Sequence, residues 1–482
     1  MKKVDFLFLS LLIILAFIFR LYKIDIPLAD LHSWRQADTA AVARNFVKDG
    51  FDLLHPRFDD LSSNQSTAGL ENPQGWRFVE FPFYNAIFAY FYTLFPQLPL
   101  EVWGRLTTAF FSLIIITIIY YLVLKEVGRI AAFFSSLIYA VFPFFVFFSR
   151  VVLPETTAVA LSMISIFFLY QFSNIKKTSL FSIFYFLFSI IFFSLSLLVK
   201  PTTIFYSLPL FFLFLQKYRL NIFGQIPVYL FFLLSFTPFF LWRWYIQKFP
   251  EGIPPFEWLI TSVNTSQGLQ KIFFRPAFFR WIFFERLNNL ILGGYLTVFL
   301  ILGVINRQKK LFLHSILLSS FLYLLIFQGG NVQHEYYQTI ILPAVAIAVG
   351  LGTAHILSYK KVFLHPLLSY LTILILFVFS FFFSYYKVRD FYFYPKELPQ
   401  IAKIISTLTK PDDKIVTDRM GDTTLLYLSQ RKGAPSIYKP PTELKKSGYR
   451  YLVTLNQEEI KKLKEANFEV VFENDQFALF KL

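Results

Sequence analysis

The chain has 482 residues, of which 56% are hydrophobic and 21% aromatic, and its mean hydropathy is +0.54. Runs of about 20 apolar residues recur along most of its length, which predicts a multi-span α-helical membrane protein and excludes a soluble globular one. The net charge of +16 would suit a nucleic-acid-binding protein. Many of the basic residues, however, lie in short loops between apolar segments, so we expect membrane lipids and no nucleic acid as partners. The absence of Cys excludes disulfide bonds and thiolate chemistry.

The apolar segments predict about eleven transmembrane helices. The first follows Lys2 and Lys3 and has no small-residue cleavage site, so we expect a retained anchor rather than a signal peptide. The predicted spans are 5–22, 104–124, 130–149, 155–173, 180–199, 203–216, 225–246, 288–306, 311–328, 338–357 and 364–386.

Alternate loops between these spans are basic, as the positive-inside rule requires. This pattern predicts a multi-pass protein of the cell (inner or plasma) membrane with a cytoplasmic N-terminus and an extracytoplasmic C-terminus. The long connections 23–103 and 247–287 are then extracytoplasmic, and we expect segment 82–96 to be a helix in the membrane interface. The basic loops contain Lys125 and Arg129, Lys176 and Lys177, Lys217 and Arg219, Arg307 with Lys309 and Lys310, and Lys360 with Lys361.

A dense polar segment, Asp30–Phe46, follows the first span. Ser33 and Gln36 have capping-box spacing, which predicts a helix that begins near Trp34. The amide-rich N-terminus of that helix would face the residues just before it and attract phosphate. We interpret the segment as the polar floor of an active site at the membrane surface. The alternative is an exposed helix in which Arg35 and Asp38 form an i,i+3 ion pair and Asp30 is a loop acid.

The composition changes from about residue 395, where charged residues become frequent and apolar runs shorten. We predict a membrane domain over 1–390 and an extracytoplasmic α/β domain over 391–482, which is large enough for its own core. Within the latter the pattern indicates strands at 414–417 and 449–455, helices at 422–430 and 457–466, and a closing hairpin of 468–472 with 476–482, turning at Asn474-Asp475.

Five clusters of polar residues converge on the predicted extracytoplasmic side, where charges near a membrane need an explanation. Each cluster also has a simpler interpretation. Lys200 would snorkel to the interface, Arg150 and Glu155 would form a plain salt bridge, Tyr336 and Tyr337 would belong to an aromatic belt, Glu80 would face water, and His334 would be an ordinary loop histidine. Because all five clusters lie on the same predicted side of the membrane, we favour one shared aqueous site. The clusters are the segment from Asp30, then Glu80, Arg150–Glu155, Lys200–Thr202 and Asn331–Tyr337.

The mixture of residue types indicates the chemistry. Carboxylates act as a general base toward an acceptor hydroxyl or amine, and Lys and Arg hold a leaving phosphate. Aromatic side chains beside a bilayer guide a lipid tail and stack on a sugar. The sequence contains no His/Cys cluster with metal-ligand spacing, so no cofactor is certain and the metal is unknown, while a carboxylate-bound divalent cation stays open.

These motifs together resemble the GT-C superfamily of membrane glycosyltransferases, in particular the bacterial protein-mannosyltransferase-like family that includes aminoarabinose transferases. The resemblance covers residues 5–390. It implies a GT-C fold, a polyprenyl-phosphate sugar donor, an inverting displacement at the anomeric carbon and an acidic base in the first outer loop. The matching motifs are Ala43-Arg44-Asn45-Phe46, Glu80-Phe81-Pro82-Phe83-Tyr84, Leu153-Pro154-Glu155, Leu198-Val199-Lys200-Pro201, His334-Glu335-Tyr336-Tyr337 and Leu342-Pro343.

The sequence departs from the family at one important place. Many relatives carry adjacent Asp-Glu near the start of the first-loop helix, where this chain has Arg35-Gln36. The resemblance therefore implies that a neighbouring acid is the base, and we favour Asp30, then Asp38, then Glu80. The remaining residues implied for the donor phosphate or the substrate are His32, Arg35, Gln36, Glu155, Lys200, His334, Glu335, Tyr336 and Tyr337.

Two other functions stay open at this point, namely a lipid-linked glycan flippase or transporter and a glycan polymerase or ligase. A transporter more often shows inverted repeats and polar residues near the bilayer midplane. The sequence does not identify the sugar, and the acceptor can be a glycan, a lipid or a protein.

Overall fold

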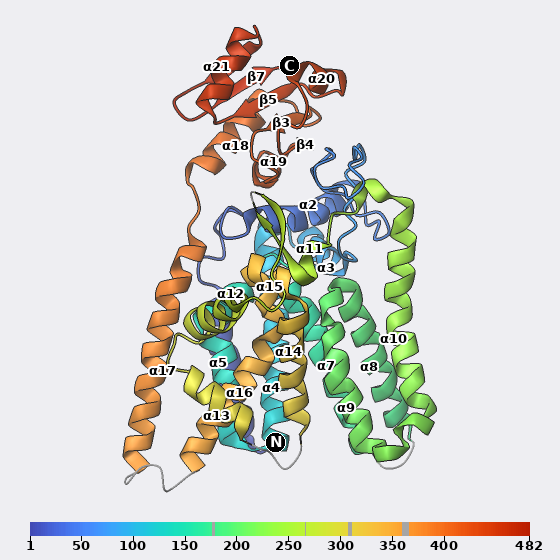
Figure 1. The fold of residues 1–482 in the computed structure, drawn as a ribbon, viewed down its shortest axis with the longest axis vertical. Helices are drawn as coiled ribbons and strands as arrows, with labels where there is room; N and C mark the ends of the chain where they lie inside the picture. The colour runs from blue at the N-terminus through green and yellow to red at the C-terminus, as the bar shows by residue number, and fades with distance from the viewer. Residues whose placement is uncertain (176–178, 266, 307–310, 359–365) are drawn as a thin grey trace. The chain divides into compact units, whose positions relative to one another are not determined.

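The computed structural model describes residues 1–175, 179–265, 267–306, 311–358 and 366–482 (Figure 1). The chain forms two compact units. Unit 1 consists of Met1–Ile24, Arg105–Trp242 and Phe256–Asp390, and unit 2 consists of Asp25–Gly104, Arg243–Pro255 and Phe391–Leu482. Several residues of the predicted basic loops lie outside the described ranges, namely Lys176, Lys177, Arg307, Lys309, Lys310, Lys360 and Lys361.

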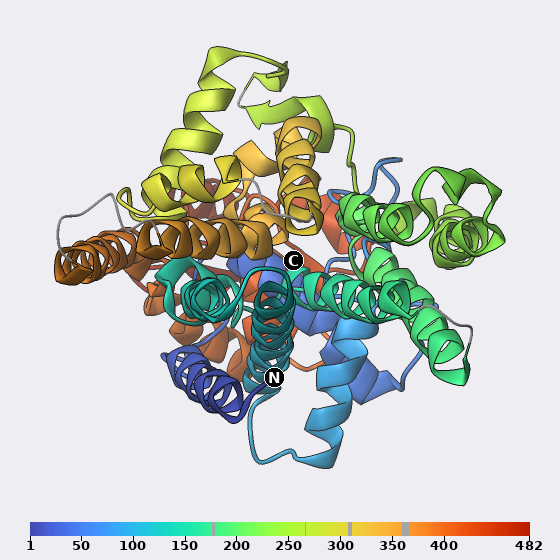
Figure 2. The ribbon, with the colours of Figure 1, turned by 90° about the horizontal axis from the view of Figure 1, so that it is seen from below.

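Unit 1 is a bundle of apolar helices (Figures 1 and 2). In the described part of the chain, six helical segments are long and apolar enough to cross a membrane, and two apolar helices, Arg129–Val141 and Phe312–Ile326, are shorter. The protein is therefore a multi-pass integral membrane protein. The six segments are Leu100–Glu126, Glu155–Asn174, Leu180–Val199, Ile226–Lys248, Glu335–Ser358 and Leu367–Leu408.

The described helices of the bundle follow the chain order. They are α1 (Lys3–Arg20), α4 (Leu100–Glu126), α5 (Arg129–Val141), α6 (Pro143–Phe148), α7 (Glu155–Asn174), α8 (Leu180–Val199), η1 (Pro201–Tyr206), α9 (Ser207–Tyr218), η2 (Arg219–Gly224), α10 (Ile226–Tyr245), α13 (Thr297–Ile305), α14 (Phe312–Ile326), α15 (Gln328–Gln333), η6 (Glu335–Ile341), α16 (Leu342–Ser358), α17 (Pro366–Val388) and η7 (Arg389–Tyr392).

At least four of the predicted spans are not single long α-helices. Segment 338–357 divides between the 3-10 helix η6 and α16. Segment 130–149 divides into α5 and α6 because Phe142, which precedes Pro143, has an extended backbone with ψ 136°, as a residue before proline prefers. Segment 203–216 divides into η1 and the 12-residue α9. Segment 288–306 divides between the π-helix η5 (Arg280–Ile291) and the nine-residue α13.

The connection 247–287 also contains local structure. It holds η3 (Ile246–Lys248), η4 (Pro250–Gly252), α11 (Trp258–Thr261), α12 (Pro276–Phe279) and an antiparallel hairpin of β1 (Ser262–Thr265) and β2 (Gly268–Lys271).

Two described residues of the predicted basic connections, Arg129 and Lys217, contact helix ends of unit 1. The Arg129 Nε atom is 2.6 Å from the Asp5 carboxylate at the start of α1. Lys217, near the end of α9, donates to the carbonyl oxygens of Phe172 and Ile175 at the end of α7, at 3.0 and 2.6 Å. These contacts agree with the alternation of loops predicted from the sequence. The assignment of this end to the cytoplasm stays a prediction.

The charged residues of the other connections lie at the opposite helix ends. Arg150 donates to the carbonyl oxygens of Tyr22 and Lys23 just beyond α1, at 3.2 and 2.9 Å. Arg105 donates to the carbonyl oxygen of Ile24 at 2.7 Å. Guanidinium groups thereby satisfy the last carbonyl oxygens of the first helix and its following turn, which have no partner within a helix.

Unit 2 contains α2 (Ser33–Asp49), α3 (Phe83–Leu94) and a five-stranded sheet in the order β4-β3-β5-β7-β6. The first three strands are parallel, and β7 is antiparallel to both β5 and β6. The strands are β3 (Ile415–Thr417), β4 (Gly433–Ala434), β5 (Tyr451–Thr454), β6 (Glu469–Glu473) and β7 (Ala478–Lys481).

Helices cover both faces of this sheet, as the alternation of its residues requires. Ile415, Val453 and Leu479 share a core with α18 (Glu397–Leu408) and α19 (Thr424–Ser429). Their chain neighbours Val416 and Leu452 point to the other face and share a core with α20 (Pro441–Lys446) and α21 (Gln457–Glu465).

The sequence predicted this C-terminal domain well. The strands near 414–417 and 449–455, the helices near 422–430 and 457–466, and the closing hairpin are all present. The helix within 82–96 is present as α3. The prediction missed α18, α20 and the two-residue strand β4, of which β4 is too short to produce a periodic pattern.

The first long connection of the chain adds to the edge of this sheet. The Gly433 amide donates to the Asp59 carbonyl at 2.8 Å, and the Leu61 amide donates to the Gly433 carbonyl at 2.7 Å. Asp60 and Gly433 thus form a parallel bridge beside β4. Unit 2 therefore joins residues 391–482 to part of the first connection, whereas the division at residue 390 stays a prediction.

We predict that Gly433→Ala destabilises unit 2, because a Cβ atom at this position would lie 1.7 Å from the Ile415 carbonyl oxygen. Overpacking of this kind costs about 1–3 kcal/mol. Thermal unfolding of the purified protein would show the loss. The control is Gly224→Ala, whose Cβ meets no atom within 4 Å. Equal unfolding temperatures for the two variants would contradict the prediction.

Candidate active site

The predicted site residues form two groups, one in each unit. The α2 group consists of Asp30, His32, Arg35, Gln36, Asp38 and Glu80 in unit 2. The lysine group consists of Glu155, Lys200, His334, Glu335, Tyr336 and Tyr337 in unit 1. That both groups serve one reaction stays a prediction.

The helix α2 begins as predicted, but with a different cap. His32 is the N-cap residue and has a left-handed backbone with φ 57°, and its carbonyl oxygen accepts from the Arg35 and Gln36 amides at 3.0 and 3.1 Å. Ser33 lies inside the helix, where its hydroxyl accepts from Thr424 Oγ1 at 2.9 Å. The predicted Ser33/Gln36 capping box is therefore wrong, because both side chains have other partners.

Gln36 holds the loop that precedes the helix. Its amide nitrogen donates to Asp30 Oδ1 at 2.7 Å and to the Leu31 carbonyl at 3.0 Å. The Leu31 amide donates to the Phe391 carbonyl at 3.1 Å. Asp30 is buried with 3% of its surface exposed, so it is a fixed acid rather than a mobile loop residue.

Arg35 and Glu80 form an ion pair that joins α2 to the segment before α3. The Arg35 side chain is 6% exposed and the Glu80 side chain 12%. Asp38 is buried as well. The alternative of an exposed helix with a surface ion pair is therefore wrong, and Glu80 does not simply face water. A charge pair removed from solvent is held firmly, since separation would leave an uncompensated buried charge.

Asp38 has a partner on each carboxylate oxygen. Thr423 Oγ1 donates to Oδ1 at 2.6 Å, and an Arg77 guanidinium nitrogen is 2.8 Å from Oδ2. Burial raises the pKa of Asp38 above its ordinary value, while the charge of Arg77 and the Thr423 hydroxyl act in the opposite direction. Asp38 therefore anchors α2 to two other segments of unit 2.

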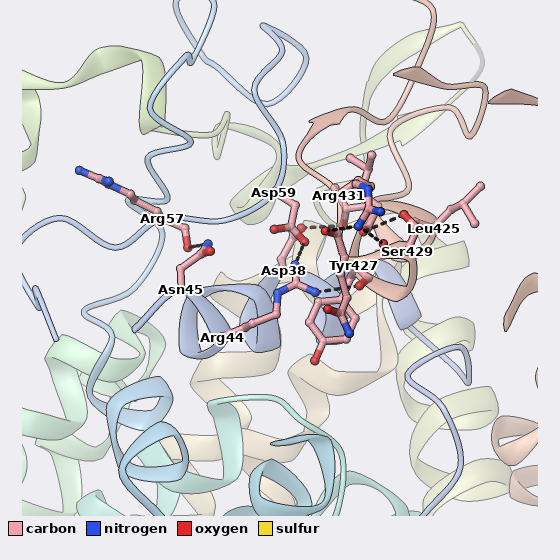
Figure 3. Close-up of polar contacts among 12 residues, drawn as sticks. Asp38, Arg44, Asn45, Arg57, Asp59, Leu425, Tyr427, Ser429 and Arg431 are labelled. Carbon is pink, nitrogen blue, oxygen red and sulfur yellow. Dashed lines mark hydrogen bonds and ion pairs between the residues drawn. The ribbon is translucent and has the colours of Figure 1, made fainter. Parts of the chain in front are cut away.

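Several charged residues near α2 were missed in the sequence. Arg44 forms an ion pair with Asp59, donates to the Tyr427 carbonyl at 2.8 Å and lies over the Tyr427 ring at 4.4 Å (Figure 3). Arg77 also donates to Gln65. Asp59, Gln65 and Arg77 lie in a part of the first connection that has no periodic pattern, and Tyr427 lies in the C-terminal domain. No local pattern therefore indicates these partners.

The carboxylates of this cluster outnumber its guanidinium groups. The acids are Asp38, Asp59, Asp60 and Glu80, and the bases are Arg35, Arg44 and Arg77. Asp60 Oδ1 accepts from the Ser62 amide and hydroxyl at 2.8 and 2.7 Å, and Asp60 Oδ2 is buried without a hydrogen bond. Burial raises the pKa of Asp60 to about 7, although the Ser62 hydrogen bonds oppose the shift. Burial therefore favours the protonated form of Asp60.

The centre of the lysine group is a buried ion pair. Lys200, the C-cap residue of α8, has its Nζ atom 2.5 Å from Glu155, the first residue of α7. The Lys200 ammonium also lies 5.2 Å from the ring centre of Tyr337 and 5.9 Å from that of Tyr336. The snorkelling interpretation of Lys200 is wrong because its side chain is buried, and Glu155 pairs with Lys200 while Arg150 binds backbone carbonyls.

Aromatic rings continue from this ion pair. The His334 ring stacks on Tyr336 with 5.2 Å between ring centres, and the Tyr336 and Tyr337 rings are 4.5 Å apart. Trp258 meets His334 edge-on at 5.9 Å. Aromatic faces beside a fixed ammonium favour cations and sugar rings.

A second cation of the lysine group was not predicted. Arg286, in the π-helix η5, forms an ion pair with Glu335 and lies 5.1 Å over the Trp281 ring. The sequence placed Arg286 in the connection 247–287, just before the predicted span 288–306. No local pattern indicates that Arg286 pairs with Glu335, so this ion pair could be found only from the tertiary fold.

The question of a metal can be addressed only for the described ranges. No group of three or more His, Cys, Asp or Glu side chains in those ranges could hold a metal ion. The proposed role of Glu155 toward a metal stays untested.

The helix bundle and the mixed sheet have the fold of solved GT-C membrane glycosyltransferases, so the predicted resemblance is confirmed in fold. ArnT from Cupriavidus metallidurans bound to undecaprenyl phosphate has this fold, with a TM-score of 0.65, 14% identity, and 98% of this chain and 97% of that chain covered. Its apo state matches with a TM-score of 0.64 and 13% identity over the same shares.

A second relative is larger. The archaeal oligosaccharyltransferase AglB from Archaeoglobus fulgidus, in complex with an inhibitory peptide and a dolichol-phosphate, has a TM-score of 0.61 and 9% identity, with 94% of this chain and 69% of that chain covered. The profile of the dolichyl-phosphate-mannose-protein mannosyltransferase family matches residues 80–242. None of the curated proteins matches the chain in sequence.

We predict that Asp60 lowers the stability of the protein as the pH rises from about 4 to about 7, because this carboxyl ionises in the unfolded chain before it ionises in the folded one. Folding raises the pKa of Asp60. The contribution of the protonated Asp60 carboxyl to stability is therefore complete below its unfolded pKa of 3.8, and it is lost as the pH rises through the folded value of about 7. The full difference is at most about 4 kcal/mol.

Asp60→Asn should make the unfolding temperature less dependent on pH across this range, because its amide does not ionise. Asp38, whose pKa is also raised, contributes in the same direction and leaves a residual slope. The control is Asp475→Asn at an exposed turn. Parallel pH profiles for wild type and Asp60→Asn would contradict the prediction.

Proposed function

We propose that this protein is an integral-membrane glycosyltransferase that transfers a sugar from a polyprenyl-phosphate donor to an acceptor on the extracytoplasmic face. The observation that carries the proposal is the likeness over 98% of the chain to ArnT, which was crystallised with undecaprenyl phosphate. The family match over residues 80–242 supports it and includes Glu80, Glu155 and Lys200. In this proposal the chain crosses the membrane about eleven times, and its N-terminus is cytoplasmic.

Glu80 is our candidate for the general base. A base must reach the acceptor, and the Glu80 side chain is 12% exposed, against 1% for Asp38. Asp30 is 3% exposed and is the second candidate. Arg35 orients the Glu80 carboxylate and, by the resemblance, occupies the place where many relatives carry an acid. This order differs from the order expected from the sequence, in which Asp30 was first.

Lys200 and Arg286 are our candidates for binding the donor phosphate. Each is held by a carboxylate, Glu155 or Glu335, which fixes its position before the donor binds. An ammonium has three N–H donors, so a phosphate can join Glu155 on the same nitrogen. The rings of His334, Tyr336 and Tyr337 supply faces for the sugar.

The proposed step is a single displacement. Glu80 takes the proton of the acceptor hydroxyl as the acceptor oxygen forms a bond to the anomeric carbon. The bond between that carbon and the phosphate oxygen breaks, and the polyprenyl phosphate leaves with the electron pair. Fixed positive charge stabilises the leaving phosphate, so no strong acid is required. The anomeric configuration inverts because the two bonds change on opposite faces.

We predict that Glu80→Gln lowers sugar transfer by about 10²- to 10⁴-fold, the usual contribution of a general base. The measurement is transfer of label from a polyprenyl-phosphate sugar to acceptors in membranes of expressing cells. Asp30→Asn tests the second candidate, and Glu397→Gln on an exposed turn of α18 is the control.

The possible results of this assay distinguish a wrong choice of catalytic base from a wrong proposed function. Full activity in Glu80→Gln would exclude it as the base. A wild-type protein that transfers no label would exclude the glycosyltransferase, and label that crosses the membrane without transfer would indicate a flippase.

We predict that the pair of substitutions Lys200→Gln and Glu155→Gln lowers transfer by about 10²- to 10³-fold, because a donor to the leaving phosphate is lost. Both charges are removed together so that no single buried charge is left unpaired. The control is Lys217→Gln, a lysine that binds backbone carbonyls at the other end of the helices. Activity that equals wild type would exclude Lys200 from phosphate binding.

A further inference from the structure

The role of the C-terminal sheet domain is the part of the molecule that the proposed function leaves unexplained. Its helix α19 contacts the first turn of α2, the turn that carries Arg35. Thr423, the N-cap residue of α19, donates one hydroxyl to two acceptors, Asp38 Oδ1 at 2.6 Å and the Trp34 carbonyl at 3.2 Å. The next residue, Thr424, donates to Ser33 Oγ at 2.9 Å.

These contacts span one complete turn of α2. Trp34 and Asp38 are four residues apart and therefore lie above one another on the same helix face. Arg35 belongs to the same turn of α2 and follows Trp34 directly in the sequence. A shift of this turn would move the Arg35 guanidinium and, through the ion pair, the Glu80 carboxylate.

The loop that precedes Thr423 is rigidly attached to the sheet. The Arg419 and Gly421 amides both donate to the Pro435 carbonyl at 3.1 Å, and the Asp418 amide donates to the Val453 carbonyl at 2.9 Å. Asp422 Oδ1 accepts from the Thr424 amide at 2.8 Å and so fixes the start of α19. The sheet therefore holds the two threonine hydroxyls in place.

Further contacts along α2 make the attachment continuous. Arg44, two turns later, binds the Tyr427 carbonyl and pairs with Asp59 (Figure 3). Asp59 belongs to the segment that adds to the sheet edge at Gly433. Four buried alanines of α2, Ala37, Ala40, Ala41 and Ala43, permit close approach of neighbouring segments.

We propose that Thr423 and Thr424 are positioning residues, through which the C-terminal sheet domain holds the first turn of α2 and sets the orientation of Arg35 toward Glu80. The roles of Arg35 and Glu80 rest on the proposed function, whereas the hold on α2 does not. The sheet domain is in this view part of the catalytic machinery and not only a cover or an acceptor-binding module.

The charged groups that face Asp38 must be included in any test that changes Thr423. They are Arg77, Arg35 and Asp59, with Asp60 close enough to interact. Since Arg77 keeps its contact with Oδ2 when Thr423 is changed, Asp38 retains a counter-charge and the variant should fold.

The test compares Thr423→Val, which removes the hydroxyl and keeps the shape, with Thr423→Ser, which keeps the hydroxyl. Thr407→Val in α18 of the same domain is the matched control, because the Thr407 hydroxyl binds only its own helix at the Lys403 carbonyl. Full-length purified proteins are used for amide hydrogen exchange and for transfer kinetics. The double variant Thr423→Val with Thr424→Val gives the larger effect.

We expect Thr423→Val to lower kcat by about 10- to 100-fold with little change in KM for the donor, as expected for misplacement of a catalytic pair by about 1 Å. Thr423→Ser should recover most of the activity. Amides of the first turns of α2 should exchange faster in Thr423→Val than in wild type or Thr407→Val.

Two results would overturn the inference. One is unchanged exchange in α2 when Thr423 and Thr424 are both replaced by Val. The other is a kcat in Thr423→Ser as low as in Thr423→Val, which would make the hydroxyl irrelevant. If the wild-type protein transfers no sugar, the proposed function fails, while the exchange measurement still decides whether the hold on α2 exists.

Discussion

The burial of charge around α2 is the constraint on which unit 2 depends. A buried carboxylate or guanidinium is tolerated only where a partner of opposite charge and further hydrogen bonds replace the water it has lost. Asp38, Asp59 and Glu80 each have an arginine partner, and those partners come from different parts of the chain. Each pair therefore joins α2 to a later part of the first connection. The sheet domain is joined to α2 by the Thr423 hydroxyl, which donates to Asp38, and by Arg44, which donates to the Tyr427 carbonyl. Without them, a helix with so few large apolar residues would have little to hold it.

The two groups of site residues differ in character in a way that suits separate tasks. The α2 group contains several acids within a network of arginines, and burial raises the pKa of the neighbouring Asp60 to about 7. The lysine group is built from two paired cations next to stacked aromatic rings. An acidic group suits proton transfer, and a cationic group with aromatic faces suits a phosphate and a sugar. The division matches the two ends of a displacement reaction.

The sequence predicted most elements of the C-terminal domain, and the structure brings the predicted residues of the lysine group close together, while their functional role stays a prediction. Lys200, Glu155 and the His334–Tyr337 segment come from separate connections, yet the structure brings them together in unit 1. The C-terminal strands were predicted because short apolar runs bounded by turn residues are typical of strands with two buried faces. The capping box failed because the Ser33 hydroxyl and the Gln36 amide had better partners in the folded protein. The sequence did not predict that Pro143 and a π-helix interrupt apolar runs.

By itself, the sequence determined that this is a helical membrane protein with a GT-C resemblance and a small α/β domain at its C-terminus. Hydropathy, basic loops and strand periodicity are local properties, so they can be read without knowledge of the fold. Only the tertiary structure decided which acid pairs with which arginine, that residues 59–61 extend the sheet, and that Thr423 contacts Asp38. These contacts join residues that are far apart in the chain. Burial and pairing depend on what lies opposite a side chain, and no local pattern records that.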